Sequence, residues 1–193
     1  MPVRGGLSRF INASTNGVAL VELLVVVVIL GVVSAISLPG LNFVLRRERV
    51  NSVALSLAGW LEEVRNLAAR RVDDSAAEGG CAIQLSPSAS MASGAVLASV
   101  EAACGARDSS FLIPQNLSGT VSASSTNGNS IIFTPRGLWI ASPPVSGQLQ
   151  IKLLLDGQGP LRCVRISETL GSIDIGRVNS SSITAECTDY TAL

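Results

Sequence analysis

An unbroken apolar stretch near the N-terminus is the strongest pattern in the chain. Residues 23–45 contain no charged residue, and residues 23–36 read LLVVVVILGVVSAI. About 20 apolar residues are enough for a helix to cross the hydrocarbon core of a bilayer, whereas a helix on a soluble domain normally keeps a polar face. We therefore expect residues 18–45 to form a membrane-inserting helix.

The helix is expected to continue past this stretch with a different character. From residue 46 onward, apolar residues recur every three or four positions, which predicts one buried stripe on an amphipathic helix. The stripe consists of Val50, Val53, Ala54, Leu57, Trp60, Leu61, Val64, Leu67 and Ala68. Residues 46–72 should therefore pack one face on a globular domain. The simplest interpretation of Arg46, Arg47 and Arg49 is that they contact lipid headgroups at the membrane surface.

Short apolar runs separated by Gly, Ser, Thr and Asn dominate residues 81–193, which favours strands joined by loops. Residues 149–153 alternate as a half-buried strand does, and residues 156–160 have the composition of a turn. The expected strands are 81–85, 95–100, 111–114, 120–123, 130–134, 138–141, 148–155, 161–167 and 173–178. The predicted fold class is α+β, with a long N-terminal helix packed on a C-terminal antiparallel β-sheet domain.

Charge and composition exclude several classes of function. The 14 basic and 14 acidic residues give a formal net charge of zero, without the excess positive charge typical of non-specific nucleic-acid binding. The chain has no histidine, which removes the commonest general base and metal ligand. It also has no Gly-x-Ser-x-Gly elbow, phosphate loop or dinucleotide fingerprint. We expect no enzyme, no catalytic residue, no metal site and no cofactor.

A basic leader precedes the apolar stretch, and an acidic residue lies where the stretch begins. Residues 1–17 contain two arginines and no acid, which is typical of a targeting segment. Glu22 is costly beside apolar residues unless a cation neutralises it. A cut between Gly17 and Val18 would supply this cation, because the new α-amino group would lie one helical turn before Glu22. A secretory signal peptide and a plain single-span anchor are the simpler alternatives.

Residues 16–26, NGVALVELLVV, resemble the class III signal of type IV pilins and type II secretion pseudopilins. That family has Gly, a cleaved bond, a hydrophobic first mature residue, Glu as the fifth, and then about 20 apolar residues. The resemblance implies a prepilin peptidase cut after Gly17, N-methylation of Val18 and a role for Glu22 in assembly. Pro39 lies where many pilins have a proline, which bends or locally melts a helix. The family's usual Phe and Thr are replaced by Val18 and Ala19.

A second resemblance lies in the β-rich region. Residues 131–137, IIFTPRG, and residues 176–178, GRV, are similar to motifs of the GspH/FimT minor pseudopilin family. In the FimT branch, a Gly-Arg-x-Arg motif is associated with DNA binding during natural transformation. Asn179 occupies the fourth position of that motif here, so the resemblance to the DNA-binding branch is incomplete.

DNA binding would require several cations to lie together. Arg162, Arg165 and Arg177 would cluster only if their strands were adjacent, which leaves DNA as an alternative partner. The simpler interpretation is that Arg177 is a surface residue paired with a carboxylate such as Asp174.

The pilin resemblance places all four cysteines, Cys81, Cys104, Cys163 and Cys187, outside the cytoplasmic membrane. None forms a Cys-x-x-Cys pair, so two structural disulfides fit better than zinc binding. Four cysteines allow three pairings, of which we favour Cys81 with Cys104 and Cys163 with Cys187. Each loop of about 25 residues would stabilise the fold by ~3 kcal/mol in the chain-entropy model.

The sequence therefore predicts a structural subunit with a leader (1–17), an apolar assembly helix (18–45), its amphipathic half (46–72) and a β-rich domain (81–193). The resemblance implies a type IV pilus or type II secretion pseudopilus in the bacterial cytoplasmic membrane. The globular domain would be periplasmic or in a surface filament. The implied partners are other pilin subunits, prepilin peptidase, an inner-membrane assembly platform and, before assembly, membrane lipid. A pilus-tip DNA-binding subunit and a membrane-anchored domain with an unknown ligand are the alternatives.

Overall fold

The computed structural model describes residues 20–70, 80–141, 147–167 and 171–192. The contacts between residues group the chain into two compact units, Met1–Asn42 and Phe43–Leu193. Gly17 and Val18, the two residues of the expected cut, lie outside the described residues, as does the rest of the leader.

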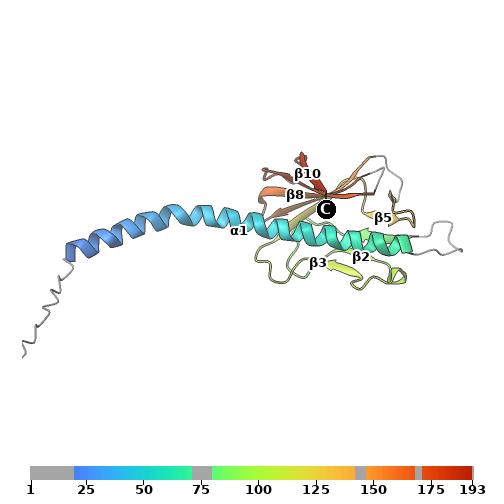
Figure 1. The fold of residues 1–193 in the computed structure, drawn as a ribbon, viewed down its shortest axis with the longest axis horizontal. Coiled ribbons are helices and arrows are strands. Elements are labelled where there is room, and N and C mark those ends of the chain that lie inside the picture. The colour runs from blue at the N-terminus through green and yellow to red at the C-terminus, as the bar shows by residue number, and fades with distance from the viewer. Residues whose placement is uncertain (1–19, 71–79, 142–146, 168–170, 193) are drawn as a thin grey trace, which may run out of the picture. The chain divides into compact units, whose positions relative to one another are not determined.

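Helix α1 (Leu20–Arg70) begins in the first unit and ends in the second (Figure 1). In the first unit, the described side chains of residues 20–35 and 41–42 are all exposed. The backbone is helical at Pro39. Among the residues that the structure describes, no helix combines the length and the apolar character needed to cross a membrane. The membrane insertion of residues 18–45 therefore stays a prediction.

The second unit contains two five-stranded sheets, and every strand pair in them is antiparallel. The first sheet has the order β3-β2-β1-β5-β6 and the second β10-β9-β8-β7-β4 (Figure 1). The bounds of the first sheet are β1 (Cys81–Leu85), β2 (Val96–Val100), β3 (Ser110–Leu112), β5 (Ser130–Phe133) and β6 (Trp139–Ala141). Those of the second are β4 (Val121–Ser125), β7 (Leu149–Leu155), β8 (Gln158–Ile166), β9 (Ile173–Val178) and β10 (Asp189–Ala192). A short 3-10 helix, η1 (Ala102–Cys104), follows β2.

The apolar stripe of α1 forms one core with the inner faces of both sheets. Leu57, Leu61 and Val64 are fully buried in this core, together with residues such as Ile83 of β1 and Ile151 of β7. All nine predicted stripe positions are buried or half-buried, which confirms the predicted amphipathic pattern. The fold class is accordingly α+β with antiparallel sheets.

A second, smaller cluster covers the outer face of the second sheet. Leu154, Leu161 and the Cys163–Cys187 disulfide are buried there, and Tyr190 packs against them. Gly176 in β9 makes this packing possible, because a Cβ atom at that position would lie 2.5 Å from the Tyr190 ring. The glycine of the Gly176–Arg177 pair is therefore required by the close approach of Tyr190.

The strand prediction is accurate for nine strands and incomplete at the C-terminus. The structure adds β10, which pairs with β9 at the edge of the second sheet. It also shortens the predicted 156–160 turn, because β8 already begins at Gln158. Asp156 and Gly157 both have positive φ angles, of 52° and 63°, as a two-residue hairpin turn requires.

Both disulfides have the expected nearest-neighbour pairing, Cys81 with Cys104 and Cys163 with Cys187. The first joins β1 to η1 within the main core, and the second holds the C-terminal segment on β8. Each sheet therefore carries one covalent link between segments that are about two dozen residues apart.

Candidate functional site

The first candidate site lies at the start of α1. Glu22 is exposed in the first helical turn. Its carboxylate forms no hydrogen bond or ion pair with any other residue that the structure describes. The large apolar residues after it, up to Val33, are 47–60% exposed. This part of the helix therefore presents a single carboxylate followed by an apolar surface on all sides.

The motif of residues 131–137 begins in β5 and continues into the turn that leads to β6. Gly137 has a φ of 75°, a left-handed conformation that favours glycine, and its N–H donates to the Thr134 carbonyl at 2.9 Å. Arg65 Nε of α1 donates to the Gly137 carbonyl at 3.1 Å. The motif thus shapes a turn that is attached directly to the amphipathic helix.

The three arginines proposed to bind DNA are divided between two faces of the second sheet. Arg162 of β8 lies opposite Arg177 of β9 in the strand register, and Arg165 lies opposite Asp174. Side chains on a strand alternate between its faces, so Arg162 and Arg177 share the face that packs on α1, and Arg165 lies on the outer face. Only two of the three predicted residues are therefore brought together.

Arg165 is engaged in contacts within the outer cluster. Its Nη2 and Nε atoms donate to Asp174 Oδ2 at 2.7 and 3.2 Å. Its Cζ atom lies 3.6 Å from the centre of the Tyr190 ring, a cation–π contact. Burial raises the pKa of Tyr190, an effect that positive Arg165 opposes. Arg165 is thus held in a structural ion pair and does not extend toward solvent as a free cation.

Arg177 is an exposed residue paired with a carboxylate, as the simpler interpretation expected, but its partner is not Asp174. The two residues are three positions apart on β9 and therefore point to opposite faces. Arg177 instead pairs with Asp189, which lies opposite it on β10, with 3.6 Å between Nε and Oδ2. Both side chains are mostly exposed, so this ion pair contributes little stability.

A cleft between α1 and the second sheet gathers three arginines. Arg47 of α1 lines it together with Arg162 and Arg177, and its volume is about 280 Å³. Glu48 and Asp189 are its acidic residues. A neighbouring hollow shares the three arginines and Asp189, and adds Phe43, Pro160, Val178 and Asn179. We call the cleft and this adjoining hollow together the arginine cleft.

Arg162 is the buried member of the arginine cleft, with only 4% of its surface exposed. Its Nε donates to Asn51 Oδ1 at 3.1 Å and its Nη1 to the Leu161 carbonyl at 3.4 Å. Burial lowers the pKa of Arg162, and the positive charges of Arg47 and Arg177 lower it further, against the opposing effect of Glu48. The cleft therefore holds a desolvated cation beside two others.

The contribution of α1 to this cleft is not predictable from the sequence. By sequence alone Arg47 is a candidate lipid contact, and no spacing in the sequence relates it to β8 or β9. Its neighbours also contact the fold, since Arg46 donates to Gln158 and Arg49 to Ser118. Only the packing of α1 on the second sheet brings Arg47 near Arg162.

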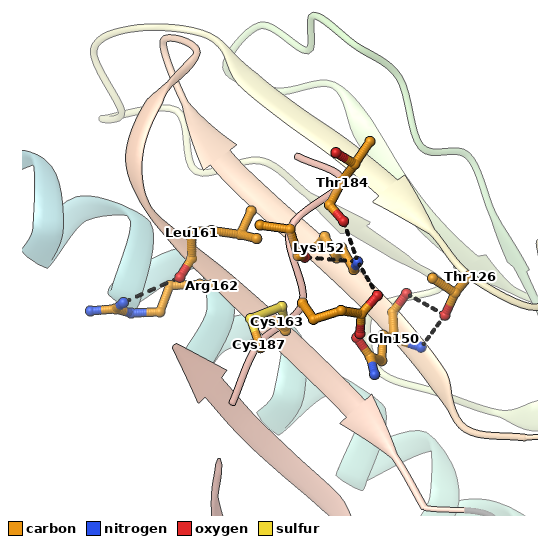
Figure 2. The surroundings of a disulfide bond; sticks show 10 residues. Thr126, Gln150, Lys152, Leu161, Arg162, Cys163, Thr184 and Cys187 are labelled. Atoms are coloured by element: carbon orange, nitrogen blue, oxygen red, sulfur yellow. Dashed lines mark hydrogen bonds and ion pairs between the residues drawn. A yellow bond between two sulfur atoms is a disulfide. The ribbon is translucent and has the colours of Figure 1, made fainter. Parts of the chain in front are cut away.

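The outer face carries one further buried cation, Lys152 of β7, which is 3% exposed. Its amine donates to the carbonyls of Ala185 at 2.8 Å and Thr184 at 3.3 Å, and it pairs with Glu186 at 3.3 Å. Figure 2 shows this amine beside the Cys163–Cys187 disulfide, with Arg162 extending away from both. Lys152 and the disulfide together hold the C-terminal segment on the sheet.

The described residues contain no group of three or more Cys, Asp or Glu side chains placed to hold a metal ion. No family model, no curated protein and no solved structure matches the chain.

Proposed function

We propose that the chain is a structural subunit, a minor pilin or pseudopilin that is trimmed after Gly17 and assembled through its N-terminal helix. The observation that carries the proposal is the junction at residues 16–26, with Glu22 five residues after Gly17. Helix α1, with an exposed carboxylate in its first turn and exposed apolar residues after it, supports the proposal. Such a surface is costly in water and favours burial against other apolar surfaces.

In this proposal the first part of α1 has two successive environments. Before assembly it lies in the lipid of the cytoplasmic membrane, and afterwards it packs against the same segments of other subunits. Glu22 sets the axial register by meeting the N-terminal amine of the next subunit, since a carboxylate in apolar surroundings needs a cation. The mechanism is packing and charge pairing, without a chemical step in the assembled subunit.

The decisive experiment is the intact mass and N-terminal sequence of the protein recovered from membranes of its own host. The proposal predicts a chain that begins at Val18 and carries one added methyl group. A chain that begins at Met1 would favour the alternative of an uncleaved membrane-anchored domain. A start at Ile36, directly after the small residues Ser34 and Ala35 that resemble a signal-peptide cleavage site, would indicate a secreted domain. The role assigned to Glu22 would then be abandoned.

A variant pair tests the role of Glu22 separately from processing. Glu22→Ala should leave the amount of membrane-bound protein unchanged and remove the subunit from sheared filaments. Glu63→Ala is the matched control, because Glu63 is also an exposed glutamate of α1. Normal incorporation of Glu22→Ala into filaments would contradict the register mechanism.

DNA binding at a pilus tip is the second candidate function, and the juxtaposition of Arg162 and Arg177 favours it. The separation of Arg165 and the acidic Glu48 and Asp189 in the arginine cleft weaken it. DNA binding by the full chain that falls steeply with salt and is lost in Arg177→Ala would support this function. Absence of binding at low salt would exclude it.

A further inference from the structure

The charge of Arg162 is only partly balanced by the protein around it. Arg162 is almost completely buried, yet no carboxylate of the described residues forms an ion pair with it. Its two hydrogen bonds go to neutral oxygen atoms, of Asn51 and Leu161. A buried charge is strongly disfavoured unless an opposite charge compensates it. The nearby Arg47 and Arg177 add repulsion that the charge of Glu48 opposes, and the three arginines of the cleft outnumber its two carboxylates.

The arrangement of the three arginines suits an anion that enters from solvent. Arg47 is exposed, and its guanidinium group has no hydrogen bond or ion pair within the described part of the chain. Arg177 is exposed too, and its contact with Asp189 is long and solvent-accessible. Guanidinium groups match the oxygen atoms of phosphate in pairs of hydrogen bonds. An anion in the cleft would thus meet two accessible arginines above a buried one.

The size and surroundings of the cleft limit the ligand. A volume of about 280 Å³ is at the lower end of ligand pockets, which favours one compact anionic group. Phe43, 44% exposed, lines the adjoining hollow, and Val44 and Leu45 beside it in the sequence are exposed as well. An anion that carries an apolar group therefore fits the two hollows better than a bare polyanion does.

We propose that the arginine cleft binds a phosphate group, carried by a phospholipid headgroup or present as a free phosphate, between Arg47, Arg162 and Arg177. The site lies wholly within Phe43–Leu193 and does not depend on pilin assembly. Asp189 competes with the ligand for Arg177. Glu48 weakens binding because its negative charge repels the phosphate group.

Calorimetric titration of the full chain in a nonionic maltoside detergent tests this proposal. The probes are inorganic phosphate, dihexanoyl phosphatidylglycerol and, for comparison, dihexanoyl phosphatidylcholine. Binding of phosphatidylglycerol in preference to phosphatidylcholine would identify a lipid headgroup as the source. Tighter binding of inorganic phosphate than of either lipid would identify a free phosphate. Either result supports the site if it depends on the cleft residues.

Three variants show whether binding depends on the cleft. Arg47→Gln should weaken binding about tenfold, the usual effect of losing a charge-assisted hydrogen bond. Asp189→Asn should tighten it roughly threefold, because Arg177 is released from an exposed ion pair. Arg107→Gln is the matched control, since Arg107 is exposed and does not line the cleft. The opposite signs separate a binding effect from loss of folding, which could only weaken binding.

Three outcomes would overturn the proposal. The first is the absence of binding of both phosphate and phosphatidylglycerol. The second is binding that Arg47→Gln and Arg107→Gln weaken equally. The third is Arg47-dependent binding of duplex DNA by a protein that binds neither small probe, which would make the cleft part of a nucleic-acid surface. None of these outcomes bears on cleavage after Gly17 or on filament incorporation, so the two proposals fail separately.

Discussion

The two parts of α1, before and after residue 43, place similar apolar side chains in opposite environments. Leu24 in the first part is 55% exposed, whereas Leu57 in the second is completely buried. The first part is apolar on every side, and the second confines its apolar residues to one stripe that faces two sheets. The comparison shows that apolar character creates a demand for burial, and that a partner surface of matching shape is needed to meet it.

The largest expected effect separates these two parts directly. Leu57→Ala should lower the free energy of unfolding of the second unit by about 2–5 kcal/mol, because it leaves a cavity in the core. Leu24→Ala should change it by less than about 0.5 kcal/mol. Urea unfolding followed by tryptophan fluorescence measures this, since both tryptophans, Trp60 and Trp139, lie in the second unit. Equal losses for the two variants would break the comparison.

The disulfides sharpen the comparison because both lie in the second unit. Replacing either cysteine pair by serine should cost about 3 kcal/mol, since both loops have nearly the same length. The urea midpoints of the two double variants should therefore be similar. A pair whose removal costs nothing would show that its loop is held by packing alone.

A buried and an exposed charge provide the next contrast. Lys152→Met should destabilise the second unit by about 1–3 kcal/mol, because the carbonyls of Thr184 and Ala185 lose their donor. Glu22→Gln should change the unfolding energy by less than about 0.5 kcal/mol, since Glu22 is exposed. Hydrogen exchange should become faster in residues 182–187 of the Lys152 variant. Unchanged exchange there would mean that the disulfide holds this segment without Lys152.

The smallest expected effect concerns Tyr190, the only tyrosine in the chain. Its phenolate absorbance should titrate above its ordinary pKa of 10.0, because burial disfavours the charged form. The raised native pKa means that the unfolded state releases this proton first as the pH rises. The stability that Tyr190 contributes is therefore complete below pH 10.0 and decreases above it. Arg165→Gln should raise the midpoint further, because it removes a positive charge that lowers the pKa. A midpoint below 10.0 in the unmodified protein would contradict burial as the dominant cause.

Local patterns predicted most of the secondary structure for identifiable reasons. The stripe from Val50 to Ala68 has helical spacing, and β7 alternates apolar and polar residues before the turn at Asp156–Gly157. β10 was not predicted because its four residues, DYTA, are too few for their alternation to distinguish a strand from a loop. It is a strand because the Cys163–Cys187 disulfide and the ring of Tyr190 hold it beside β9.

The two candidate sites also differ in how far apart their residues lie along the chain. The pilin-like junction at Gly17, Val18 and Glu22 is a contiguous motif, so it can be read directly, although Gly17 and Val18 lie outside the described residues. The arginine cleft joins Arg47 to residues more than a hundred positions later in the chain. Prediction of that contact would require the crossing of α1 over β8 and β9, which no local pattern contains.

Side-chain periodicity, which acts over a few residues, is enough to show where the helix is apolar on all sides, where it becomes amphipathic, and where most of the strands lie. No local pattern shows that Arg165 pairs with Asp174, that Arg177 faces Asp189, or that Arg162 is buried next to Arg47. Strand register and helix packing make those choices, because they set which distant side chains share a face and which are separated by the sheet.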